Sequence, residues 1–299
     1  MPPQTTRLTF ADLDGWDSDD HGAGLAVFLL SAHGIVPTGD PKVWIERNFQ
    51  PTLFTDDRPA LFTGYYEPEL IGSRVRSNEF SVPLHVKPAN MGTPWLTRRE
   101  IDQTDALRGH ELVWLRDPLD RFFLQVQGSG RIQLIEGGQM RVGYDGTNGH
   151  PYASLGKEMI RLGHIPADVI SPQAIRDWFA QYPDQLSLLW HNASYVFFRA
   201  VTEVPADSGP IGTMGVSVTA GRTIAVDPDI TPLGAMVWLE KHGAQPFSRL
   251  MVAQDTGSAI KGAQRADIFV GTGPKAGHIA GGYRDSGRMV VLLPKEQMD

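Results

Sequence analysis

The chain has 299 residues, of which 41% are hydrophobic and 20% charged, a balance typical of a globular protein with a substantial core. Its net charge of −7 argues against broad electrostatic binding to nucleic acid or to an anionic membrane. Because cysteine is absent, disulfides, thiolate catalysis and zinc–thiolate sites are excluded. There is no run of about 20 apolar residues and no N-terminal signal sequence, so we expect a cytosolic chain or one that begins after a removed targeting segment.

The first fifty residues predict helices. An apolar run at 25–30 follows several aspartates, whose charge favours a helix N-terminus, and residues 41–49 predict a second, shorter helix. Residues 61–68 then form a β-rich octapeptide. Because Pro68 lacks a backbone donor, it should end this strand or place it at a sheet edge.

The middle of the chain is mixed. Short strands separated by turns are predicted at 80–86, 111–115, 122–126 and 132–135. One helix is expected at 154–162, and Ser171 and Pro172 suit the N-cap and first turn of another. Its aromatic residues share one face, which favours a buried stripe over a ligand platform.

A proline- and glycine-rich segment at 204–210 indicates a linker. The pattern beyond it is purely β, with strands predicted at 215–218, 223–226, 236–239, 250–253, 267–270 and 289–293. Six short strands at such spacing favour a small closed barrel.

Two aspartates in this last part, Asp255 and Asp267, are candidates for acid–base chemistry. Each borders an apolar run and a glycine-rich turn, and a rigid sheet could hold a carboxyl group in place. Ordinary turn chemistry is the alternative. The Asp-Thr-Gly-Ser run at Asp255 is similar to an aspartic protease signature, but such enzymes need two facing copies, and no second copy lies at a suitable spacing.

Other signatures point away from cofactors. The nine histidines form no metal-binding spacing, and residues 271–277 lack the pattern of a nucleotide-binding loop. We therefore expect no metal and no cofactor. Residues 144–152 and 63–67 combine aromatic rings with amide and carboxyl groups, which suits a sugar, although turns beside buried tyrosines would explain them equally well.

Together these segments resemble the membrane-bound lytic murein transglycosylase A family over nearly the whole chain. The matching motifs lie at 63–68, 126–130, 148–152, 192–195 and 219–228, and the most specific are Asp255-x-Gly-x-Ala-Ile-Lys-Gly and Arg265-Ala-Asp-Ile-Phe-x-Gly-x-Gly. The resemblance implies a mainly β fold with some α: a double-psi β-barrel domain (1–68 and 201–299), an inserted smaller β domain (69–200), and a groove between them for a glycan strand.

The resemblance also implies an activity, the non-hydrolytic cleavage of peptidoglycan between N-acetylmuramic acid and N-acetylglucosamine, which leaves a 1,6-anhydro ring. Asp267 aligns with the family's catalytic aspartate and would act first as acid and then as base, while Asp255 would assist it. The matched motifs suggest substrate contacts for Thr63, Tyr65, Gln127, Asn148 and Tyr195. A hydrolytic muramidase and a non-catalytic glycan-binding module are the alternatives.

The implied partners are peptidoglycan glycan strands and possible proteins of the cell-wall machinery, without nucleic acid. We expect a monomer in the periplasm or cell envelope. Members of the family are often lipoproteins, and the absence of cysteine leaves a lipid anchor without its attachment residue.

Overall fold

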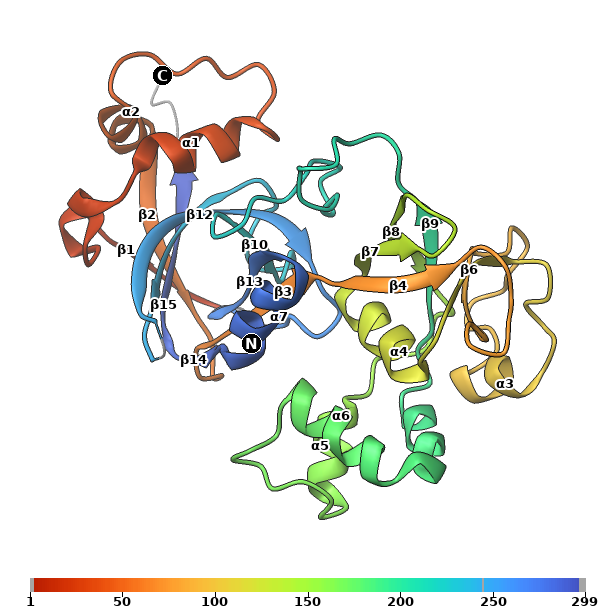
Figure 1. The fold of residues 1–299 in the computed structure, drawn as a ribbon. Helices are drawn as coiled ribbons and strands as arrows, with labels where there is room; N and C mark the ends of the chain where they lie inside the picture. Colours follow the sequence, from red (N-terminus) through yellow and green to blue (C-terminus); the bar gives the residue numbers. More distant parts are fainter. Residues whose placement is uncertain (1–2, 244, 296–299) are drawn as a thin grey trace. The chain divides into compact units, whose positions relative to one another are not determined.

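In the computed structural model, which describes residues 3–243 and 245–295, the chain divides into two compact units (Figure 1). The first contains residues up to 66, 206–271 and from 275 onward, and the second contains 67–205 and 272–274. The protein is mainly β with some helix, and its strands form two sheets. No helix in the described ranges is long and apolar enough to cross a membrane.

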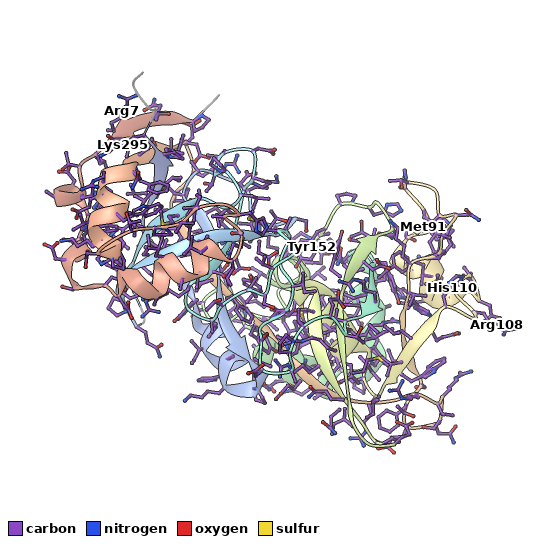
Figure 2. All side chains as sticks on the ribbon, turned by 90° about the horizontal axis from the view of Figure 1, so that it is seen from above. Arg7, Met91, Arg108, His110, Tyr152 and Lys295 are labelled. Carbon is purple, nitrogen blue, oxygen red and sulfur yellow. The ribbon has the colours of Figure 1, made fainter. Side chains whose placement is uncertain are left out.

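The first unit is built on a nine-stranded sheet. In spatial order its strands are β1 (Gln4–Arg7), β2 (Phe49–Thr55), β15 (Gly287–Pro294), β11 (Met236–Lys241), β12 (Phe247–Thr256), β10 (Thr223–Val226), β13 (Arg265–Thr272), β3 (Leu61–Glu67) and β14 (Arg284–Asp285). Arg7 on β1 and Lys295 just after β15 both belong to this unit, so the two ends of the described chain meet in one sheet (Figure 2).

Strand β11 shows why the strands of this sheet are almost continuously apolar. Met236 and Trp238 pack into one core with α1 (His21–Leu29) and α2 (Pro41–Asn48), whereas Val237 and Leu239 pack into a second core on the other side. Successive side chains of a strand point to opposite faces. A strand between two cores therefore buries both faces, and simple alternation of apolar and polar residues disappears.

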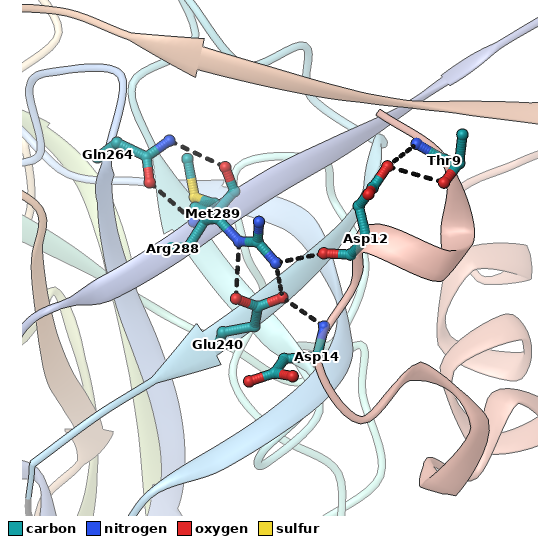
Figure 3. Close-up of polar contacts among 7 residues, drawn as sticks. All are labelled: Thr9, Asp12, Asp14, Glu240, Gln264, Arg288 and Met289. Atoms are coloured by element: carbon teal, nitrogen blue, oxygen red, sulfur yellow. Dashed lines mark hydrogen bonds and ion pairs between the residues drawn. The ribbon is translucent and has the colours of Figure 1, made fainter. Parts of the chain in front are cut away.

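Polar side chains fasten the N-terminal segment and the start of β13 to this sheet (Figure 3). Arg288 and Glu240 face each other on β15 and β11, with an Nη2–Oε1 distance of 2.6 Å, and Arg288 also donates to the Asp12 carbonyl. Gln264, just before β13, exchanges two hydrogen bonds with the Met289 backbone through its side-chain amide. The Gln264 amide thus takes the place of a neighbouring strand beside Met289, and it holds the chain where β13 begins.

The second unit contains a six-stranded sheet and a group of helices. The strand order is β5 (Val82–His85), β6 (Glu111–Leu115), β4 (Glu69–Ser73), β7 (Ser129–Leu134), β8 (Gln139–Thr147) and β9 (Val196–Ala200). Its helices are α3 (Arg98–Gln103), α4 (Pro118–Gln127), α5 (Leu155–Arg161), α6 (Pro172–Gln181) and a 3-10 segment at Pro183–His191.

Many of the predicted elements are confirmed. Strands β6 and β10 have the expected bounds, and α6 begins where Ser171 accepts a hydrogen bond from the Ala174 backbone. Its residues Ile175 and Phe179 are buried in a helical core, as expected. Strand β3 ends at Glu67, immediately before Pro68.

The strand predicted at 122–126 is wrong, because these residues lie within α4. Asp117 caps that helix by accepting from the Leu119 backbone, Pro118 occupies its first turn, and Gly128 ends it with a φ of 79°. A short apolar run fits a buried helix as well as a strand. The cap residues on either side of this run, Asp117 and Gly128, favour the helix over the strand.

The purely β interpretation of the last third is also wrong in two places. Residues 215–218 form no strand, since only an isolated bridge joins Ile211 and Ser217. Residues Gly273–Gly282 form helix α7, which glycines made hard to recognise. The helix packs closely on β3, where an added Cβ on Gly64 would lie 2.9 Å from the Ala280 Cα.

Candidate active site

The two candidate aspartates flank the same residue of one central strand. Strand β10 lies between β12 and β13, and its Ala225 is in register with Asp255 on β12 and with Asp267 on β13. With strands about 4.8 Å apart, the two aspartate Cα atoms are separated by roughly 10 Å. The sheet therefore brings together two carboxyl groups that lie on separate strands. A register shift between Ile224 and Ala225 marks the same place, and such irregularities often re-aim side chains beside active sites.

Strand β3 contributes a hydroxyl donor to each aspartate. Thr63 Oγ1 donates to Asp267 Oδ1 at 2.5 Å, and the Tyr65 hydroxyl donates to Asp255 Oδ2 at 2.8 Å. Thr63 and Tyr65 are two residues apart and share a face, while Phe62 points into the core on the other side. Burial and the nearby Asp255 raise the pKa of Tyr65 well above its usual range, so this phenol stays protonated and remains a donor.

The carboxyl group of Asp255 is held by four hydrogen bonds. Besides Tyr65, the backbone and the hydroxyl of Thr213 both donate to Oδ1 at 3.0 Å, and the Thr256 backbone donates to the same oxygen at 2.9 Å. Burial raises the pKa of Asp255, and these donors oppose that shift only in part. Both oxygens are engaged, so Asp255 is fixed in orientation.

Asp267 has a different environment. Within the described ranges, Thr63 is its one hydrogen-bond donor, and Oδ2 is left without a protein partner. Burial has the largest influence on the pKa of Asp267 and raises it, and the Asp255 charge adds a small upward contribution. The Thr63 hydrogen bond and the Arg265 charge lower this pKa, but the net direction is upward. Lys261 does not offset this, because its ammonium is bound by Asp227 at 2.9 Å and by Asp229 at 3.2 Å. The result is a half-buried acid with a raised pKa and an available oxygen.

The three candidates in the second unit differ among themselves. Asn148 is fully buried, and its side chain bonds to the carbonyls of Leu96 and Ala193 and to the Tyr195 backbone. Tyr195 is also fully buried, with its hydroxyl 2.8 Å from His85 Nδ1. Such burial argues against direct substrate contact and favours a structural role for both. Gln127, the last residue of α4, is partly exposed and remains a candidate.

Two further polar residues were not singled out from the sequence. Thr213 lies in an irregular segment without a motif, so no local signal marks it as a donor to Asp255. Glu67 ends the β3 motif and is fully buried, where it binds the guanidinium groups of Arg131 and Arg141 and the Thr272 hydroxyl. The presence of Glu67 in the β3 motif is therefore explained by its structural role in the second unit.

No group of three or more histidine, aspartate or glutamate side chains in the described part of the chain is placed to hold a metal ion. The paired carboxyl groups and their hydroxyl donors form a candidate acid–base site in a mainly β protein.

Comparison with known proteins identifies the family. A family model described as the MltA specific insert domain matches residues 61–199, and one described as the 3D domain matches 222–293. The membrane-bound lytic murein transglycosylase A of Vibrio cholerae is 31% identical over 277 residues, which cover 86% of this chain and 73% of that protein. The chain belongs to the membrane-bound lytic murein transglycosylase A family.

Relatives from other bacteria agree with this assignment. The Escherichia coli K12 protein of the same name is 36% identical over 242 residues, and the match covers 77% of this chain but only 65% of that protein. A crystal structure of membrane-bound lytic murein transglycosylase from Agrobacterium tumefaciens has a TM-score of 0.85 at 29% identity, covering 97% of this chain and 98% of that one. A structure of E. coli MltA with bound chitohexaose has a TM-score of 0.74 at 29% identity, covering 98% and 92%.

Proposed function

We propose that this protein is a lytic transglycosylase that cleaves the β-1,4 bond between N-acetylmuramic acid and N-acetylglucosamine in peptidoglycan without water. The observation that carries the proposal is Asp267: a half-buried carboxyl group with a raised pKa, anchored through Oδ1 and available through Oδ2. Membership of the lytic murein transglycosylase A family supports this reaction, and the oligosaccharide bound by E. coli MltA supports a glycan as the ligand.

In the proposed reaction Asp267 acts twice. Its protonated Oδ2 first donates the proton to the glycosidic oxygen, so that the bond to the muramic acid C1 breaks. The resulting carboxylate then accepts the proton of the C6 hydroxyl of the same sugar as that oxygen attacks C1 and closes the 1,6-anhydro ring. Because the nucleophile belongs to the substrate, a second carboxylate is not needed to activate water, unlike in ordinary glycosidases.

The raised pKa of Asp267 suits the first step, since an acid must still carry its proton near the working pH. Thr63 assists the same step, because its hydroxyl stabilises the carboxylate that forms as the proton leaves. We assign Asp255 a supporting part. Its four donors fix it in place, and its charge contributes to the raised pKa of Asp267.

The finer features of the fold belong to the same proposal: a double-psi β-barrel catalytic domain, an inserted smaller β domain and a groove for the glycan strand. Thr63 remains a proposed substrate-side residue beside the aspartates, Tyr65 is proposed to act through the Asp255 carboxyl group because it is buried, and Gln127 is retained as a candidate contact. The envelope is the proposed location, since it contains the substrate and the relatives are named as membrane-bound. We also propose that the protein is a monomer and that it uses no metal and no cofactor.

An Asp267→Asn variant tests the catalytic assignment. The amide keeps the shape of the side chain but cannot donate the proton, so release of anhydro-muropeptides from purified sacculi should fall by about 10²–10⁴-fold, as expected for loss of a general acid and base. Asp168→Asn is the matched control, because Asp168 is exposed, belongs to the second unit and makes no side-chain ion pair within the described ranges, so the rate should stay unchanged. Undiminished release by folded Asp267→Asn protein would refute the assignment.

The products distinguish the other activities. A hydrolytic muramidase would yield a reducing end that is heavier by one water, about 18 Da, than the anhydro product. A glycan-binding module would bind sacculi and release nothing. Either result with the wild-type protein would exclude the proposed reaction.

A further inference from the structure

The second unit contains a polar cavity that the proposed reaction does not use. Its volume is about 260 Å³, and all of its lining residues fall between Arg76 and Arg121. Pro83 and His85 of β5 and the preceding Ser81 line it, while Val82 and Leu84 point into the core on the other face. Glu111 and Trp114 of β6 and Asp102 of α3 complete the walls. The cavity is therefore one face of a strand pair covered by a helix.

The innermost groups of the cavity are rigidly held. Arg121 Nη2 binds Asp102 Oδ1 at 2.6 Å, and Asp102 also accepts from the Trp190 indole. The Nδ1 atom of His85 is occupied by the Tyr195 hydroxyl, which leaves Nε2 as the ring nitrogen that can meet a ligand. Burial lowers the pKa of His85 to about 4, so the ring is neutral near pH 7. This wall is preorganised and does not need to order on binding.

One buried donor in this wall lacks a partner. Arg121 is only 8% exposed, and its Nε atom is buried and makes no hydrogen bond within the described part of the chain. Leaving a buried donor unsatisfied is costly, and each such group calls for an explanation. Because this Nε atom is itself shielded from solvent, it reflects the polar character of the wall and is not counted as a ligand contact.

The outer wall carries one cation and one carboxylate that are not paired. Arg76 lies over the Trp114 ring, with its guanidinium carbon 5.6 Å from the ring centroid, and within residues 3–243 and 245–295 it forms no ion pair. Glu111 accepts a hydrogen bond from the Gly109 backbone and, within the same ranges, also has no ion pair. By contrast, the exposed Arg108, which also lines the cavity, is paired with Asp105 at 2.7 Å.

We propose that this cavity binds the α-amino-acid head of a peptide, that is, an ammonium and a carboxylate on the same carbon. Arg76 would receive the carboxylate through paired guanidinium donors, and Glu111 would receive the ammonium. The Trp114 face would cover the adjoining methylene groups, as indole rings do in small-molecule sites. A singly charged ligand would leave one of the two charges unpaired.

The size of the cavity supports a small head group. Pockets for drug-sized ligands are roughly 300–1,000 Å³, and this cavity lies just below that range. Acylation of the ligand's amine, as in a cross-linked peptide, turns the ammonium into a neutral amide and removes the partner of Glu111. The cavity should therefore distinguish a free peptide end from an acylated one.

The test is calorimetric titration of the full chain near pH 7 with meso-2,6-diaminopimelate, which carries two such head groups. Binding is expected at one site, and the N,N′-diacetyl derivative and pimelate should each bind at least tenfold more weakly. Arg76→Gln and Glu111→Gln should each weaken binding at least tenfold, with unchanged circular dichroism. Arg74→Gln is the matched control, because Arg74 is exposed and does not line the cavity.

Two results would overturn the proposal: no heat of binding with diaminopimelate at millimolar concentration, or equal affinity for its diacetyl derivative. The Asp267→Asn variant should bind the probe as the wild type does. This measurement distinguishes the proposed binding in the cavity from the proposed glycan cleavage, because either proposal can fail while the other holds.

Discussion

Thr63→Val gives the sharpest test of how the acid is tuned, because it removes one hydroxyl and keeps the branched shape of the side chain. The Thr63 hydroxyl donates to Asp267 Oδ1 at 2.5 Å. A hydrogen bond to an ionised acceptor contributes about 1.5–3 kcal/mol, and one to a neutral acceptor about 0.5–1.5 kcal/mol. The free energy of unfolding should therefore fall by the larger amount when Asp267 is ionised and by the smaller amount when it is protonated.

The sign follows from the pKa of Asp267. In the folded wild type this pKa is raised above the ordinary value of 3.8, so the protonated form is favoured and stability from this group is lost as pH rises through the folded pKa. The Thr63 bond acts in the opposite direction because it favours the carboxylate. Removing it raises the pKa of Asp267 further, and the variant should lose more stability at mildly alkaline pH than near pH 3.8.

Urea unfolding at these two pH values measures the difference directly. The same comparison in an Asp267→Asn background is the control, and there the effect of Thr63→Val should not depend on pH. The alkaline limb of the pH–rate profile on sacculi should also move to higher pH, since more of the acid form survives. An equal loss of stability at both pH values, or a limb that moves to lower pH, would refute this account of the tuning.

Three further variants probe the surroundings of the site. Asp255→Asn should reduce anhydro-muropeptide release only partly and move the alkaline limb to lower pH, because a negative charge that raises the pKa of Asp267 is removed; complete inactivity would contradict the supporting role. Asn148→Ala should lower the free energy of unfolding by about 1–3 kcal/mol or more, because buried carbonyls lose their donors, while KM for glycan in the folded protein stays unchanged. Gly64→Ala should cost about 1–3 kcal/mol through overpacking against Ala280, which thermal unfolding would show, and a neutral effect would mean that α7 can move away from β3.

Local signals in the sequence determined several elements correctly. Ser171 and Pro172 mark the start of α6 because an N-cap acceptor and a fixed φ act within one turn of the chain. Likewise, the proline after Glu67 ends β3 at the predicted residue. The identity of Asp255 and Asp267 as candidates, and the family itself, also came from motifs that are contiguous in the chain.

Only the tertiary structure decided what surrounds those motifs. Thr63 and Asp267 are 204 positions apart, and Thr213 reaches Asp255 across 42 positions from a segment without a motif. Asn148 lies in a matched motif yet is fully buried, so the pattern alone could not separate a substrate contact from a structural one. Periodicity and capping act over a few residues, whereas pKa, burial and hydrogen-bond partners depend on strands that the fold brings together. The sequence thus determined which aspartates to examine, and the sheet decided that Asp255 is fixed by four donors while Asp267 keeps an oxygen available.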